Sequence, residues 1–186
     1  MRLTLMFPMF LLAACGTGST TDTSGGSDTS GGDTSGGDTG PNGYGDGACV
    51  SGEKWTGGNR ESEDMNPGQA CIECHSSSDE APSFAIAGTV YTNYDEPKNC
   101  NGLDGATVRV TDASGNTYED KTNSVGNFYI SSRDARIKTP YTAEVEFADG
   151  TVATMAGEQT SGDCNSCHTQ DGAEGAPGRI SNFAGQ

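Results

Sequence analysis

Two Cys-x-x-Cys-His motifs constrain this chain more than any other feature of its sequence. They read CIECH at residues 71–75 and CNSCH at residues 164–168. The 186-residue chain has only two histidines, and each directly follows a Cys-x-x-Cys pair. On a helical turn, residues i, i+3 and i+4 share one face. Each motif can therefore present two sulfurs and one imidazole to a single bound group.

Residues that favour helix starts precede both motifs. Asn66 is a predicted N-cap and Pro67 a predicted first helical residue before the first motif. Ser161 or Asp163 is predicted to cap the second turn. Beyond that, nothing in the sequence marks Glu73, Asp163 or Asp171 as more than solvated surface charge.

The N-terminus predicts export. Arg2 precedes an apolar run that is too short to span a bilayer as a mature helix. The run ends in Leu-Ala-Ala-Cys, which resembles a bacterial lipobox. That resemblance implies a lipoprotein signal peptide at 1–14, lipidation of Cys15, and stable anchoring by several acyl chains. We expect a lipid anchor in the outer membrane, at its periplasmic or cell-surface face, with an ordinary cleavable signal as the alternative.

Residues 15–48 are predicted to form a disordered Gly/Ser/Thr/Asp tether. The segment holds three DTSGG repeats and offers almost nothing apolar to bury, so it cannot offset its ordering entropy. Loss of Arg2 with the signal takes the formal net charge from −16 to −17. Such acidity excludes nucleic acid as a partner. The negative charge is expected to keep the protein soluble. The alternative is that it attracts a basic partner protein.

The seven cysteines divide into three groups. Cys15 is the predicted lipidation site, and four cysteines belong to the two motifs. Cys49 and Cys100 remain, and an even remainder in an exported protein predicts a disulfide between them.

The stretch between the motifs predicts strands. Short β-branched or aromatic segments alternate with Gly, Asn, Asp or Pro. These segments are residues 84–92, 105–112, 116–122, 126–132, 141–148 and 151–156. Ala113-Ser114-Gly115-Asn116 and Asp149-Gly150 suit tight hairpins. The fold class predicted is therefore all-β: a small antiparallel β-sandwich flanked by two short helical CxxCH segments.

The text AGTVY…GATVRVTDASGNTYEDKTNSVGNFYI…PYTAEVEF, over roughly residues 85–148, resembles the transthyretin-like, carboxypeptidase-regulatory type of β-sandwich. In that family the module is usually structural or an interaction domain. The chain also offers no Ser or acid pair with a base to activate it. We therefore expect no enzyme activity from this part of the chain.

The two motifs resemble the haem attachment sites of c-type cytochromes. The resemblance implies two covalent haems c, held through thioethers by Cys71, Cys74, Cys164 and Cys167. His75 and His168 would be the proximal iron ligands, so the distal ligands must come from elsewhere. Met65 and Met155 are the two methionines left after signal removal. Both are candidate distal ligands, since a thioether opposite His raises the haem potential.

Three other readings of the motif cysteines stay open. Four thiolates could bind zinc, although zinc ribbons usually separate their pairs by about 15–20 residues, whereas 89 residues lie between Cys74 and Cys164. Each pair could instead close as a local disulfide. Free thiols are the least expected state in an oxidising compartment.

Residues 49–180 also resemble an uncharacterised family of bacterial lipoproteins with two haem-type motifs, through the pattern WTGGN…M-x-PG-x-AC-x-x-CH…SGDCNSCHTQ. The predicted organisation behind the tether is a first CxxCH segment at 49–83, the β-sandwich at 84–156, and a second CxxCH segment with a C-terminal tail at 157–186. The expected function is electron transfer to a redox partner protein at the outer membrane. The alternative is a non-catalytic surface β-sandwich stapled at the Cys-x-x-Cys pairs by disulfides or zinc.

Overall fold

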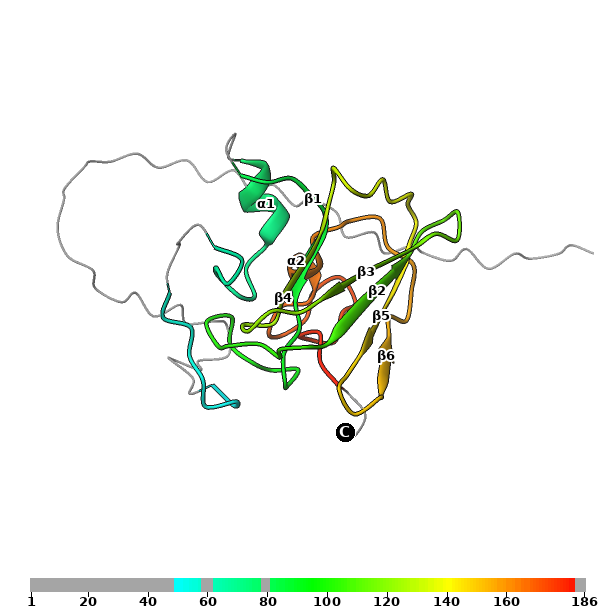
Figure 1. Ribbon diagram of the computed structural model, residues 1–186. Coiled ribbons are helices and arrows are strands. Elements are labelled where there is room, and N and C mark those ends of the chain that lie inside the picture. Colours follow the sequence, from blue (N-terminus) through cyan, green and yellow to red (C-terminus); the bar gives the residue numbers. More distant parts are fainter. Residues whose placement is uncertain (1–48, 58–61, 78–80, 183–186) are drawn as a thin grey trace, which may run out of the picture.

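A computed structural model of the protein describes residues 49–57, 62–77 and 81–182. Two antiparallel sheets and two short helices make up these ranges (Figure 1). The predicted signal peptide, Cys15 and the tether lie outside the described residues. Among the residues described, none belongs to a helix long and apolar enough to cross a membrane.

Six strands form where six were predicted, and each is shorter than its sequence segment. They are β1 Phe84–Thr89, β2 Thr107–Thr111, β3 Thr117–Lys121, β4 Asn127–Ser131, β5 Thr142–Glu146 and β6 Val152–Thr154. Strands β1 and β4 pair as one sheet, and β3-β2-β5-β6 form the other. All pairings are antiparallel. The all-β prediction is confirmed.

Side-chain alternation explains the larger sheet. Val108 and Val110 on β2 are at most 2% exposed and face the core, where Val145 of β5 pairs with Val108. Arg109 points to the opposite, solvent face, where it forms ion pairs with Glu119 of β3 and Glu144 of β5. The sheet therefore has one apolar and one charged face, as the period-two pattern requires.

The predicted hairpin turns both form. Asp112 accepts backbone N–H groups of Ser114 at 2.8 Å and Asn116 at 2.9 Å, which closes the turn between β2 and β3. Gly115 has φ +80° and Gly150 has φ +81°, a conformation that glycine adopts without strain.

Apolar side chains from both sheets and from the loop before β5 form one core. Its buried members are Ile86, Val90, Ala106, Val108, Val110, Phe128, Ile130, Ala135, Tyr141, Val145 and Phe147. Cys164, Met155 and Ile180 pack against this cluster from outside the sheets. The second motif therefore borders the hydrophobic core through Cys164.

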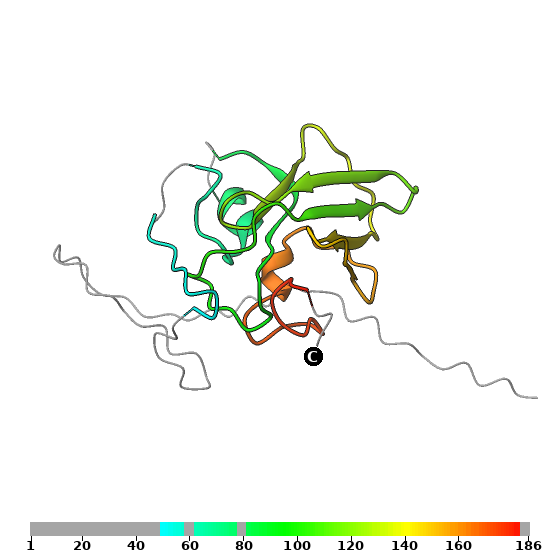
Figure 2. The ribbon, with the colours of Figure 1, turned by 60° about the horizontal axis from the view of Figure 1, so that its bottom comes forward.

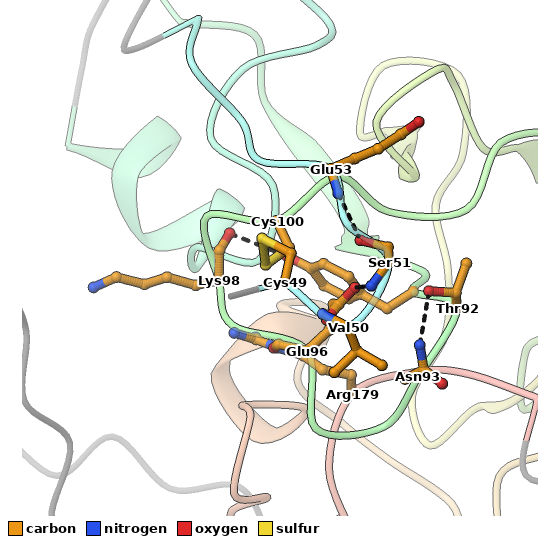
Figure 3. Close-up of a disulfide and its surroundings, with 11 residues drawn as sticks. Cys49, Val50, Ser51, Glu53, Thr92, Asn93, Glu96, Lys98, Cys100 and Arg179 are labelled. Atoms are coloured by element: carbon orange, nitrogen blue, oxygen red, sulfur yellow. Dashed lines mark hydrogen bonds between the residues drawn. A yellow bond between two sulfur atoms is a disulfide. The ribbon is translucent and has the colours of Figure 1, made fainter. Parts of the chain in front are cut away.

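The disulfide predicted between Cys49 and Cys100 is present, with Cα atoms 5.5 Å apart (Figure 3). The carboxylate of Glu96, which is fully buried, accepts the backbone N–H groups of Val50 and Ser51, both at 2.7 Å. Together these contacts hold the first described residues against the domain.

The first helix starts later than the sequence suggested, whereas the second starts directly after Asp163, one of its two predicted caps. Helix α1 spans Cys71–Ser76 and has Ala70 at its N-cap, so the prediction of Asn66 as N-cap and Pro67 as first helical residue was wrong. Asn66 has φ +42° instead, and the chain turns there. Helix α2 spans Cys164–Cys167, and His168 lies just beyond its end.

Candidate cofactor site at the paired cysteine motifs

The two motifs, distant in sequence, lie against the same strand. Backbone N–H of Ala87 in β1 donates to the Gly162 carbonyl at 3.0 Å, and Ala87 forms an isolated parallel bridge with Asp163. Helix α1 contacts the same strand. Figures 1 and 2 show both short helices beside β1, with α2 between the strands and the C-terminal segment. The structure thus brings together the two segments that flank the sandwich in sequence.

Asp163 connects the motifs directly. It occupies the N-cap position of α2, but its side chain makes no cap bond there. Its Oδ2 instead accepts the backbone N–H of Glu73 in α1 at 3.0 Å. Asp163 is only 9% exposed, which corrects the expectation of a solvated surface charge. Burial raises the pKa of this carboxyl, an effect that N–H donors from the first turn of α1 partly offset.

Asn165 makes a second connection. This residue of CNSCH is 3% exposed, and its Nδ2 donates to the Gln69 carbonyl at 2.8 Å, just before the first motif. The same nitrogen lies 3.1 Å from Thr89 Oγ1, and Asn165 Oδ1 accepts the Thr89 backbone N–H at 3.0 Å. The side-chain amide therefore joins both motifs to the end of β1.

Both motif histidines are held in the same way. His75 Nδ1 lies 3.0 Å from the Pro82 carbonyl oxygen, and His168 Nδ1 lies 2.9 Å from that of Gly178. A carbonyl oxygen only accepts, so the proton sits on Nδ1, and Nε2 keeps its lone pair. This is the usual arrangement for a metal-ligating imidazole. Burial lowers the pKa of His168, which further favours the neutral, ligating form.

A cavity of about 650 Å³ adjoins the second motif. Cys164, Cys167 and His168 line it together with Met155, and apolar core side chains such as Phe128 form much of its wall. Cofactor-sized ligands occupy cavities of roughly 300–1,000 Å³ with mostly apolar walls. The size and the largely apolar lining of this cavity therefore fit a cofactor of porphyrin size, which Cys164, Cys167, His168 and Met155 would hold.

The first motif is more open. Cys74 is exposed and His75 half-buried, and neither lines the cavity at the second motif. Met65 does not line that cavity either. The His75 ring packs on Phe84, with ring centroids 4.5 Å apart, and Phe84 packs in turn on Tyr129 at 4.7 Å. The two motifs are thus unequal sites: one faces an apolar cavity, the other the surface.

The oxidation states of the motif cysteines help to distinguish haem attachment, zinc binding, local disulfides and free thiols. Cys71, Cys74 and Cys164 are free thiols, so neither Cys-x-x-Cys pair is closed as a local disulfide. Burial, then the nearby Asp163, raises the pKa of Cys71 and of Cys164 to about 12. Cys167 is disulfide-bonded. In the described part of the chain, no group of three or more His, Cys, Asp or Glu side chains is arranged to hold a metal ion.

Arg179 holds the segments around the site together. This residue is 3% exposed, its guanidinium lies 5.1 Å from the centroid of the Tyr91 ring, and its Nε donates to the Glu96 carbonyl at 2.9 Å (Figure 3). Its Nη1 donates to the carbonyls of Gly68 at 3.2 Å and His168 at 3.1 Å. Nothing near Arg179 in the sequence distinguishes it from a surface arginine, so its role is visible only in the folded chain.

Comparisons with protein-family models, curated proteins and solved structures find no match to this chain.

Proposed function

We propose that the protein is a dihaem electron carrier of c-type cytochrome character, with one haem at each Cys-x-x-Cys-His motif. The observation that carries this proposal is the shared geometry of the two histidines. Each donates a hydrogen bond from Nδ1–H to a backbone carbonyl oxygen, which leaves the Nε2 lone pair available to bind iron. With only two histidines in the chain, this orientation at both sites favours a common function.

The cavity supports the proposal at the second site. Cys164 and Cys167 would hold the macrocycle, and His168 and Met155 would be the candidate iron ligands. The apolar walls would exclude water and favour the less charged ferrous state. A haem there supplies a one-electron couple between ferrous and ferric iron. The protein residues fix the iron ligands and the polarity around them.

The first site would hold its haem through Cys71, Cys74 and His75, nearer to solvent. Met65 remains the candidate for its distal ligand. Exposure of this motif suits exchange of electrons with a redox partner protein. The acidic chain favours a basic partner. Anchoring through lipidated Cys15 at the outer membrane, beyond the tether, is proposed from the sequence alone.

The second candidate function is a non-catalytic surface sandwich stapled at the cysteine pairs. One observation favours it: the Cys49–Cys100 disulfide already staples the domain. Free thiols at three of the four motif cysteines argue against local disulfides as the staple. Zinc at the motif cysteines is the remaining form of this alternative, although the described residues hold no group of three or more donors arranged for a metal ion.

Site-specific variants test the proposal in protein exported by a host that matures c-type cytochromes. Cys164→Ser/Cys167→Ser should reduce covalent haem from two per chain to one, as should Cys71→Ser/Cys74→Ser. Met155→Leu, which nearly conserves volume, should remove the sulfur-to-iron charge-transfer absorption of the second haem. Haem content that is unchanged in both double variants would contradict the proposal. An unchanged charge-transfer band in Met155→Leu would reject Met155 as a ligand.

A further inference from the structure

The connection between β4 and β5 carries a concentrated group of positive charges. Residues 132–140, the basic loop, contain Arg133, Arg136 and Lys138 and a single acid, Asp134, which gives the loop a net charge of +2 in a chain of net charge −16. All three cationic side chains are exposed. The loop is the yellow segment that links β4 to β5 in Figure 1.

Contacts with the core hold the basic loop in place. Ala135 is 6% exposed, and Ile137 packs against the hydrophobic core. The Lys138 carbonyl accepts the Ala113 backbone N–H at 2.9 Å. Arg136 and Lys138 lie on either side of Ile137 in the chain, and both side chains are exposed to solvent. The charges therefore sit on a fixed backbone that needs no rearrangement to meet a partner.

The cations of the basic loop lack a carboxylate partner. Arg133 and Arg136 form no ion pair within the described ranges, and Lys138 Nζ donates to the Ser114 hydroxyl at 3.1 Å. Arg109, by contrast, lies among three glutamates on the solvent face of the larger sheet. The chain has 26 acidic and only 10 basic residues, so unpaired cations on its surface are unexpected. The basic loop is therefore a place where this acidic domain attracts negative charge.

A matching acidic segment is present in the same chain. Residues 16–48 hold five aspartates and no lysine or arginine, and they join the domain at Cys49. We propose that this acidic tether docks on the basic loop. The inference does not rest on haem binding, because it needs only the charges of the two segments.

Reach and charge both favour the tether as the occupant. A Gly/Ser-rich segment of this length has a mean span of about 30 Å. A domain of this size is about 35 Å across, so the tether can reach most of the surface. Since the rest of the domain is acidic, it repels the tether and leaves the basic loop as the favourable contact.

Covalent attachment gives the tether an advantage over a free anion. Single exposed ion pairs contribute little. A contact within one chain, however, benefits from an effective concentration of the order of millimolar. The contact is also screened by salt, since the Debye length falls from about 10 Å at 0.1 M to about 3 Å at 1 M. Docking would therefore act as a salt-sensitive device that shortens the spacer between the domain and the anchor proposed at Cys15.

The test uses the full-length chain after removal of the signal, with a nitroxide in the tether. Cys71, Cys74 and Cys164 are free thiols, so the label is attached through a non-natural amino acid in place of Ser30 rather than through a cysteine. Nuclear magnetic resonance then measures how strongly the nitroxide broadens each backbone amide signal. The same chain with a diamagnetic analogue of the label is the reference.

Two double variants separate the basic loop from net charge. Arg133→Glu/Arg136→Glu reverses the charge of the loop at exposed positions. Lys54→Glu/Lys121→Glu is the matched control, because it makes the same change in net charge at exposed lysines outside the loop.

At low ionic strength, the amide signals of residues 133–138 should be broadened severalfold more than those of the rest of the domain. This excess should disappear in 1 M salt and in Arg133→Glu/Arg136→Glu, and should persist in the lysine control. Broadening spread evenly over the surface, or an excess that survives the loop reversal, would overturn the inference. Broadening that a labelled chain causes only in a second, isotope-enriched copy would overturn it too, because the contact would then join two molecules. A protein without haem would reject the proposed function and leave this result unaffected.

Discussion

Arg179→Leu should destabilise the protein by about 3 kcal/mol. The guanidinium donates to three backbone carbonyls, those of Gly68, Glu96 and His168, and Leu leaves all three without this donor. A hydrogen bond from a charged donor is worth about 1.5–3 kcal/mol, and Nη1 is shared by two acceptors, so the gross loss is about 3–6 kcal/mol. Relief of the desolvation cost of a buried cation brings the net value towards the lower end.

Urea unfolding followed by the fluorescence of Trp55, the single tryptophan, measures this loss. Arg179→Lys keeps the charge but not the planar fork, and should lose about half as much. Arg136→Leu is the matched control, because Arg136 is exposed, and it should change the free energy of unfolding by less than about 0.5 kcal/mol. A loss below about 1 kcal/mol in Arg179→Leu would refute the view that Arg179 holds the segments around the site together.

Three further predictions concern the disulfide, the first hairpin and the motif thiols. Cys49→Ser/Cys100→Ser opens a loop with a sequence separation of 51, and chain entropy sets the upper loss in the free energy of unfolding at about 4 kcal/mol; an unchanged urea midpoint would contradict this. The pKa of Asp112 is lowered because its turn N–H bonds outweigh desolvation, so its stabilisation is present above the unfolded pKa and is lost as pH falls through the folded one. Asp112→Asn should therefore weaken the pH dependence of the free energy of unfolding on the acid side. An unaltered dependence would contradict this role of the Asp112 carboxylate. In protein produced without haem attachment, an alkylating reagent should modify exposed Cys74 quickly and Cys71 only on unfolding. A pKa of about 12 leaves roughly one Cys71 thiol in ten thousand ionised at pH 8. Equal alkylation rates of Cys71 and Cys74 in the folded protein would contradict the burial of Cys71.

The sheets could be predicted because their signal is local. Alternation of Val108 and Val110 with Arg109 sets the two faces of β2, and Asp112 with Gly115 closes the next turn within a few residues. The disulfide followed from counting cysteines. Each of these inferences needs only neighbouring residues or the chemistry of the compartment.

The connections within the site could not be predicted in the same way. Asp163 was expected to cap its own helix or to face solvent, but its side chain caps α1, whose residue Glu73 is 90 positions away. Arg179 and Asn165 act on carbonyls that only the folded chain brings near. Sequence spacing does not encode such contacts, because the sandwich between the motifs decides which loops meet. The cavity beside Met155 depends on the same packing.

An alkaline pyridine haemochrome spectrum of the mature protein tests the central claim most directly. The protein should be exported from a host with cytochrome c maturation, with its zinc content assayed in parallel. Two haems per chain should stay attached through denaturation, and no stoichiometric zinc should be found. Absence of covalent haem would contradict the proposed function, and the zinc stoichiometry would then distinguish a metal-stapled sandwich from one held by disulfides alone.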